Sequence, residues 1–575
     1  MSDFSSDYKD LLSTFNLMNP LERNHKIDGL HTDAQSFDFA ENNDEGKNEP
    51  GDGIIFTDTQ CLADKFSLSS KRVLSILTNF INDAQERGFE WRLLDVSESR
   101  WKKLLSADKS PYSYHKVLDT FAATSSWETD ADTCLFIIGG NDVIPIKQRV
   151  DSSDYRDFLT DEDIYYCFPL DFDLEDELLD NITEESTPEQ ISSFLMQNAK
   201  FNVSRLPLDS RKIEYNIDDT IEHYFKRVSE CFGIIPVNNI QFTTARQWEK
   251  ASDYIAQGLP LLELENKPGL IKNGIFLSPL VDIDNVGSTA EYYSSMQKAD
   301  LLLFNLHGTD EYGKSAYFGD NGNPNQHVQP RAFDIESLDY FNGSIINSMA
   351  CFGAKYNNSG QSLLLSSIYC NTLLFAGSSN LAWGQQSSEL PCGCSEAFLR
   401  IYTGLLLEGI PAGKAFLQSK CDYLAYFMPI DGFDKAYFTI REFNLFGDPT
   451  LSCQCLSNSK SLSIPDYSLT FMRNPKGAIH SRYGITAMSV LDEVYETVRD
   501  AVDNNLREIS VRLGHYLHND LGYNDVKLSK IEKISNNKSG KEYRFTYSFE
   551  QLFNRGCIEV LTNSKGESIS VFYTK

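Results

Sequence analysis

The chain has 575 residues, of which 41% are apolar and 23% are charged, a balance typical of folded globular proteins. Its formal net charge is −30, which argues against non-specific binding to nucleic acid or to an anionic membrane, because both require a basic surface. At roughly 150 residues per domain, the length predicts about three or four domains.

The N-terminal segment and the cysteines indicate a cytoplasmic protein. The first residues lack the basic and apolar regions of a secretory signal, and apolar runs such as 301–304 are too short to cross a bilayer. The 12 cysteines follow no repeated spacing, so we expect free thiols in a reducing compartment. The pairs Cys392/Cys394 and Cys453/Cys455 lack the spacing of structural zinc ligands, and we expect no metal there.

The first half of the chain begins with a tail, residues 1–52, whose end (41–52) is acidic, has no apolar residue and is expected to be a linker. From residue 53 to 235, short apolar runs alternate with amphipathic segments, as in a parallel α/β sheet. We expect strands of this N-terminal α/β subdomain at 54–59, 91–96, 133–140 and 201–207, and helices at 73–81, 110–123 and 214–230.

The second half repeats this alternation and predicts another α/β subdomain at 236–455. Its expected strands lie at 239–245, 274–279, 301–308, 344–351 and 372–379, with helices at 396–407 and 413–426. A small α+β domain is expected at 456–575, with a regulatory or partner-binding role. It has a helical period at 491–511, alternating strands at 543–549, 556–562 and 568–574, and a hairpin turn at 562–568.

Two strands of the second subdomain end on residues that can carry chemistry. One runs into His307 and Gly308, and another runs into Ala350 and Cys351. Open α/β sheets place their sites at the carboxyl ends of strands, and an imidazole is the usual activator of a thiol nucleophile. The pair predicts a Cys–His site with the Gly308 and Cys351 N–H groups as oxyanion donors. In the alternative interpretation both residues have only structural roles: Cys351 is a small core residue, and His307 is a hydrogen-bonded loop residue.

Six sequence blocks, in order over roughly residues 54–455, strengthen the catalytic interpretation. They are TCLFIIGGNDVIPI (133–146), DEDIYYCF (161–168), FNVSRLPLDS (201–210), NLHGTDEYG (305–313), NSMACFG (347–353) and NLFGDPTL (444–451). A strand ending in His-Gly followed by one ending in Ala-Cys resembles the caspase-like (clan CD) cysteine peptidases, most closely the gingipain family. The resemblance implies two successive caspase/gingipain-like α/β subdomains with parallel-rich sheets.

The resemblance also implies roles for individual residues. Cys351 would attack the scissile carbonyl, and His307 would protonate the leaving amine and then help water attack the thioester. A carboxylate of the first subdomain would orient the histidine, a role that falls on Glu162 or Asp163. The competing interpretation of this acidic cluster is a solvated loop.

Substrate binding is expected in the segment GSSNLAWG (377–384), at Ser378, Ser379 and Trp383. Trp383 would form a wall of the pocket for the P1 residue, the residue before the cut, although a tryptophan here is equally suited to a core. The acidic stretch 171–180 favours Arg or Lys at P1, with Asp or Asn as alternatives. No cofactor is required, and a structural Ca²⁺ in the acidic loops is a secondary expectation without any EF-hand spacing.

The chain departs from the gingipains in lacking a secretion signal, and a peptidase in the cytoplasm needs restraint. We expect the tail 1–52 or the domain 456–575 to block or complete the cleft, or to bind an activator or inhibitor. Under basic specificity, Arg23 and Lys47 are candidate points of autocleavage.

The leading hypothesis is therefore a cytoplasmic cysteine endopeptidase whose partner is a protein or peptide substrate. One alternative is a non-catalytic scaffold that keeps a vestigial dyad, although the intact His-Gly and Ala-Cys pairs speak against decay. Another is a different thiol enzyme on an α/β sheet, such as an acyltransferase or amidase, which would turn over small molecules instead of peptides.

Overall fold

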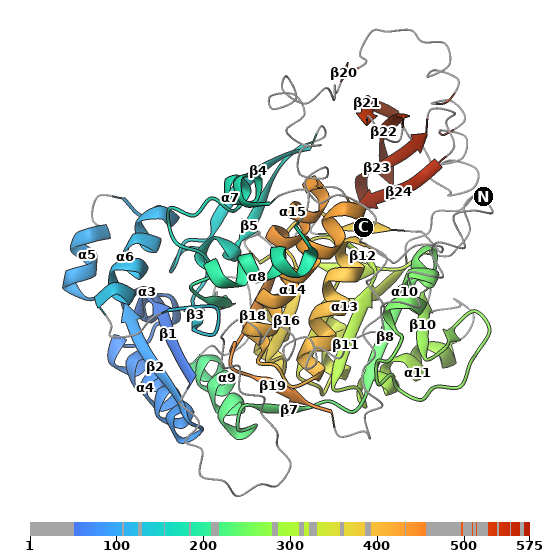
Figure 1. Ribbon diagram of the computed structural model, residues 1–575. Coiled ribbons are helices and arrows are strands. Elements are labelled where there is room, and N and C mark those ends of the chain that lie inside the picture. Colours follow the sequence, from blue (N-terminus) through green and yellow to red (C-terminus); the bar gives the residue numbers. More distant parts are fainter. Residues whose placement is uncertain are drawn as a thin grey trace, which may run out of the picture.

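A computed structural model gives the structure of the chain (Figure 1). It describes residues 51–455 except 106–107, 125–128, 154–155, 183–185, 209–217, 279–285, 310–314, 321–329, 357–361, 386–392 and 432. Towards the C-terminus it describes 496–497, 509, 513, 527–536, 540–551, 554–563 and 568–574. The expected tail up to residue 50, with Arg23 and Lys47, lies outside the described residues.

One large, mostly parallel sheet organises the body, which confirms the α/β class. It has 11 strands in the order β2-β1-β3-β6-β18-β16-β15-β11-β8-β10-β9. Their bounds are β1 Gly51–Thr57, β2 Phe89–Asp95, β3 Cys134–Ile138, β6 Asn202–Leu206, β8 Ile240–Ala245, β9 Ile271–Lys272, β10 Ile275–Ser278, β11 Leu301–Asn305, β15 Ile345–Ser348, β16 Leu374–Ser378 and β18 Phe443–Gly447.

The two expected halves of the body contribute to this single sheet and run in opposite directions. Strand β18 pairs parallel with β6 of the first half and antiparallel with β16 of the second. The carboxyl ends of β11, β15 and β16 therefore lie at the same edge as the start of β18. We call this the catalytic edge, because it carries His307 and Cys351, the residues that the sequence predicts to be catalytic.

Helices cover both faces of the sheet, so its central strands are buried throughout. Every residue of β3, β6, β11, β16 and β18 is buried, as expected for parallel strands packed on both sides. In Figure 1, α13 and α14 lie in front of the central strands. The helices are α3 Thr59–Phe66, α4 Ser70–Glu86, α5 Ser99–Leu105, α6 Pro111–Thr124, α7 Leu174–Asn181, α8 Pro188–Asn198, α9 Asp218–Glu230, α10 Glu249–Ile255, α11 Val286–Met296, α12 Leu363–Cys370, α13 Cys394–Leu407, α14 Ala412–Asp431 and α15 Phe433–Glu442.

The body also contains smaller sheets. An antiparallel hairpin precedes the acidic cluster, and a three-stranded sheet follows β11. Their strands are β4 Lys147–Ser153 and β5 Arg156–Glu162, then β12 His307–Thr309, β13 Ala316–Phe318 and β14 Arg331–Phe333. A further parallel pair joins β7 Ile234–Pro236 to β19 Ser452–Gln454.

The C-terminal region forms an antiparallel sheet that includes a strand from the body. Its order is β17-β24-β23-β22-β21-β20. The bounds are β17 Trp383–Gln385, β20 Glu496–Thr497, β21 Lys527–Asn536, β22 Gly540–Gln551, β23 Asn554–Asn563 and β24 Ser568–Thr574. The three alternating strands predicted from the sequence are confirmed, and residues 564–567 of the predicted hairpin turn lie outside the described residues. The helix predicted at 491–511 is wrong at Glu496 and Thr497, which pair with β21 as a strand.

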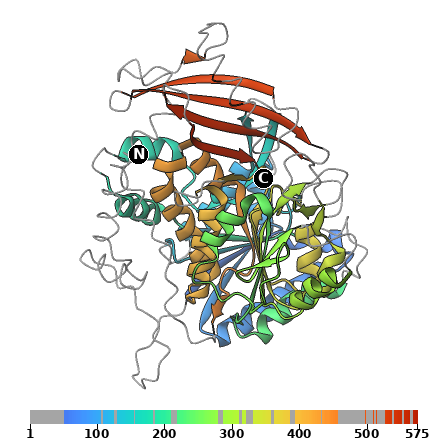
Figure 2. The same ribbon diagram turned by 90° about the vertical axis from the view of Figure 1, so that its right-hand side faces the viewer.

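In both views the C-terminal sheet lies across the catalytic edge of the body (Figure 2). Among the described residues, no helix combines the length and the apolar character needed to cross a bilayer.

Candidate active site

The register of two neighbouring strands brings His307 and Cys351 to matched positions. In the parallel pair of β11 and β15, Phe304 lies opposite Ser348, so His307 and Cys351 both follow this pair by three residues. Gly308 packs directly on the second chain segment, since a Cβ built there would lie 1.9 Å from the Cys351 carbonyl oxygen. Only a glycine permits this close approach, which places the His-Gly and Ala-Cys segments side by side.

The chain turns sharply at Cys351, and the thiol is fully buried. Its Sγ accepts a hydrogen bond from the Ala382 N–H at 3.2 Å. The next residue, Phe352, has the left-handed φ of 54°, while its N–H donates to the Asn380 carbonyl at 2.7 Å. A bulky residue in this region costs on the order of 1–3 kcal/mol, and such strain is concentrated at functional sites.

The imidazole of His307 is held by residues that follow the adjacent strand β8. Its Nε2 lies 2.8 Å from the side-chain nitrogen of Gln247, and its ring centroid lies 4.4 Å from that of Trp248. The contacts with Gln247 and Trp248 orient the ring. Neither residue was predicted from the sequence, because each follows a strand whose place beside β11 is known only from the fold.

The acidic cluster of the first half reaches the catalytic edge. Ser379, at the end of β16, donates from Oγ to the Asp161 carbonyl at 2.9 Å, and Asn380 donates to the Thr160 hydroxyl at 2.7 Å. The hairpin β4–β5 therefore packs beside the loop that contacts Cys351. The interpretation as a solvated loop is wrong, because Asp161, Glu162 and Asp163 are all buried.

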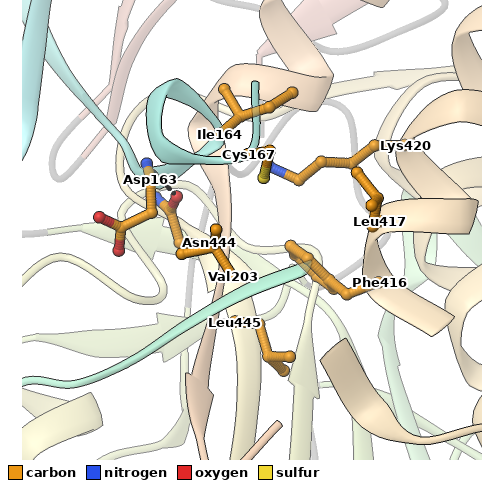
Figure 3. Close-up of a pocket in the computed structure, with 9 residues that line it drawn as sticks. All are labelled: Asp163, Ile164, Cys167, Val203, Phe416, Leu417, Lys420, Asn444 and Leu445. Atoms are coloured by element: carbon orange, nitrogen blue, oxygen red, sulfur yellow. Dashed lines mark hydrogen bonds between the residues drawn. The ribbon is translucent and has the colours of Figure 1, made fainter. Parts of the chain in front are cut away.

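Asp163 forms a buried ion pair with Arg205 of β6. Arg205 Nη2 lies 2.6 Å from Asp163 Oδ1, and its Nε lies 2.9 Å from Oδ2. The Asp163 N–H also donates to the side-chain oxygen of Asn444, a contact drawn in Figure 3. Asp163 thus ties the first half to β18, and its role in orienting His307 stays a prediction.

A small buried pocket adjoins this ion pair, between β18 and α14, and neither His307 nor Cys351 lines it. Figure 3 shows the Lys420 ammonium group and the Cys167 sulfur pointing toward one another in it. Lys420 donates to the Ile440 and Phe443 carbonyls at 2.6 and 2.8 Å. Burial lowers the pKa of Lys420 to about 8. These contacts hold the end of α15 and the start of β18 in place.

Glu162 is also engaged by an arginine. Its Oε2 lies 2.9 Å from Arg441 Nε, and both side chains are buried. Burial raises the pKa of the Glu162 carboxyl, and the positive charges of Arg441 and Arg149 offset part of that effect. Orientation of His307 by Glu162 is untested by these contacts and stays a prediction.

The three expected substrate-binding residues lie at this edge but are buried. Ser378 Oγ lies within hydrogen-bond distance of the Asn380 carbonyl at 2.9 Å and of Glu442 Oε2 at 3.0 Å. Trp383 packs against Cys394 and Phe438, with the Lys435 ammonium 5.2 Å from its ring centroid. Both serine hydroxyls hold the loop after β16, and Trp383 follows the residue that contacts the thiol.

The catalytic edge therefore has two parts. His307, Gly308 and Cys351 meet at the ends of β11 and β15, while the remaining predicted residues surround the end of β16 and are engaged in structural contacts. Within the described part of the chain, no group of three or more His, Cys, Asp or Glu side chains could hold a metal ion. The Ca²⁺ expectation stays a prediction, and Cys392 lies outside the described residues.

Comparison with known proteins adds no assignment to this geometry. No family model matches the chain, and no curated protein sequence matches it. The function is therefore argued from the residues of the catalytic edge.

Proposed function

We propose that the protein is a cysteine endopeptidase of the caspase/gingipain type, with Cys351 as nucleophile and His307 as general base and acid. The observation that carries the proposal is the packing of Gly308 on the Cys351 backbone at matched strand ends. This packing brings a thiol, an imidazole and two candidate oxyanion donors to one edge of a parallel sheet, where α/β enzymes build their sites.

The reaction follows from these groups. The Cys351 thiol gives its proton to His307, and the sulfur forms a bond to the scissile carbonyl carbon. The Gly308 and Cys351 N–H groups stabilise the oxyanion. The C–N bond then breaks, and His307 returns the proton to the leaving amine. Water attacks the thioester with His307 as base, the C–S bond breaks, and the thiol regains its proton.

The proposal also includes the substrate specificity of the enzyme and the control of its activity. We propose Arg or Lys at P1, with Asp or Asn as alternatives, a cytoplasmic location and latency until activation. The strained turn at Phe352 favours catalysis over a scaffold, since such strain is concentrated at functional sites. No described contact specifically favours small-molecule acyl transfer.

Hydrolysis of fluorogenic peptides with Arg, Lys, Asp or Asn at P1 tests the proposal. The native chain and Cys61→Ala, a matched cysteine variant on α3, are expected to release the fluorophore slowly, because the proposed enzyme is latent, whereas Cys351→Ala is expected to release none. Detectable hydrolysis at equal rates by Cys351→Ala and the native chain would overturn the assignment, and the preferred peptide identifies the P1 class.

A further inference from the structure

The strand β17 provides a backbone edge that leads to the thiol. It begins at Trp383, and the preceding residue, Ala382, donates its N–H to Cys351 Sγ at 3.2 Å. A peptide in extended form binds an open strand edge through main-chain hydrogen bonds. A peptide added to β17 would therefore run past Cys351.

One edge of β17 is already occupied by the chain itself. Strand β24 pairs antiparallel with β17, and the register places Trp383 opposite Thr574, Gly384 opposite Tyr573 and Gln385 opposite Phe572. The next strand of the C-terminal sheet, β23, lies against β12, the strand that carries His307. The sheet thus contacts the strand that carries His307, and it pairs with β17, whose preceding residue donates to the Cys351 sulfur.

Buried apolar side chains hold the C-terminal sheet in place, in addition to the pairing of β17 with β24. Phe545 and Tyr547 of β22 lie opposite Val560 and Ile558 of β23, and all four side chains are buried. They belong to the same continuous core as the body of the protein. This burial makes the closed arrangement the ground state of the chain, since apolar area removed from water favours docking.

We propose that β24 is an inhibitory strand that occupies the substrate edge of β17 and closes the site over Cys351. The inference rests on the proposed peptidase function and specifies its regulation. An extended substrate and β24 compete for the same backbone groups of β17. Turnover requires β24 to leave, and any activator acts by loosening the β17–β24 ladder.

The first test releases the strand in the full chain. Phe572→Pro and Tyr573→Pro are made separately, because successive N–H groups point to opposite sides of a strand and one of the two faces β17. Ser535→Pro, in β21 on the far side of the same sheet, is the matched control. Fluorescein maleimide labelling of Cys351, mapped by mass spectrometry, reports closure without requiring peptide turnover.

We expect the Cys351 labelling rate of at least one β24 variant to exceed that of Ser535→Pro by about tenfold or more, as for a shift between closed and open populations. Peptide hydrolysis should rise in the same variant. Equal labelling in the native chain, both β24 variants and the control would overturn the inhibitory strand.

The second test locks the strand, so that the answer does not depend on how a proline variant folds. Gln385→Cys with Phe572→Cys places two cysteines opposite each other, and Ser535→Cys with Lys541→Cys does so at the far end of the sheet. Cross-strand partners suit a disulfide, with Cα atoms about 4.5–5.5 Å apart. The first lock should slow Cys351 labelling until dithiothreitol is added, and the second should leave it unchanged.

The outcomes separate the two claims. If the β17–β24 lock leaves labelling and hydrolysis at the native rate, the inhibitory strand is wrong and the peptidase stands. If labelling responds to release and lock as expected, but no variant cuts any peptide, the strand closes the site and the proposed function is wrong.

Discussion

At the scale of single residues, the closest approach at the catalytic edge is between Gly308 and Cys351. A methyl group at position 308 would lie 1.9 Å from the carbonyl oxygen of Cys351 and 3.0 Å from the Cβ of Ala350. Both obstacles belong to the segment that presents the nucleophile. Relief of the overlap must therefore move His307 and Cys351 relative to each other.

Gly308→Ala is expected to remove most of the activity although it removes no reactive group. A misplacement of about 1 Å at a reacting centre costs about 100-fold in rate, so we expect at least this loss in kcat/KM. The control is Gly404→Ala in α13, where the new Cβ would meet only the Arg400 guanidinium, at 3.1 Å. Near-native activity of Gly308→Ala would contradict the close packing of the two segments.

How much of the site the sequence could predict is clearest at this scale. His307 and Cys351 end apolar strands beside small residues, so their place at one edge follows from strand period and the parallel topology. Gln247 carries no such signature, because a glutamine after a strand is ordinary. Its contact with His307 depends on the neighbour relation of β8 and β11, which only the fold supplies.

At the scale of elements, a buried carboxylate links the start of α13 to the end of α14. Asp431 Oδ2 accepts from the Cys394 N–H at 2.8 Å and from the Tyr423 hydroxyl at 2.7 Å. Burial raises the pKa of Asp431 to about 6, with Lys435 opposing and Glu396 reinforcing the change. The folded state therefore binds a proton at Asp431 that the unfolded state has already released.

This link predicts a pH dependence of stability. Between the ordinary pKa of 3.8 and about 6, the folded chain holds more protons at Asp431, so its contribution to stability is lost as pH rises through that window. A tenfold difference in proton affinity between the folded and unfolded states corresponds to about 1.4 kcal/mol of stability. Urea unfolding at several pH values should show that Asp431→Asn lacks this loss. Identical pH profiles for the native chain and Asp431→Asn would contradict the raised pKa.

Some strands were predicted correctly from the sequence, and others were not. The buried strands β3, β11 and β16 were predicted, because unbroken apolar runs of this length are typical of parallel sheets. Strand β18 was not predicted as a strand: Phe443–Gly447 follows α15 directly, and so short a run cannot be told from the end of a helix by its period. The helix predicted at 491–511 includes β20, whose pairing with β21 is a tertiary contact.

At the scale of the whole molecule, β18 makes one structural unit of the two halves. It lies between β6 and β16, and the Arg205–Asp163 ion pair and Asn444 reinforce the junction. One continuous core runs from the first strands to the buried residues of the C-terminal sheet. The halves therefore have no separate interiors that could unfold independently.

This continuity predicts cooperative unfolding across the junction. Phe56→Ala in β1 removes a fully buried ring, at a cost of about 3–5 kcal/mol. Amide hydrogen exchange should then lose protection in β15 and β16 as much as in β1 and β3. Loss confined to the first half would contradict a shared core and indicate two independent subdomains.

The central claim is that Cys351 attacks peptide carbonyls with the help of His307, and covalent trapping tests it most directly. Peptidyl chloromethyl ketones with the four P1 residues would be incubated with the native chain, Phe572→Pro, Tyr573→Pro and the corresponding His307→Ala variants. Mass spectrometry would then locate the thioether. We predict modification at Cys351 that requires His307 and is fastest in a β24 variant. Modification spread over other cysteines, or equally fast without His307, would contradict the account.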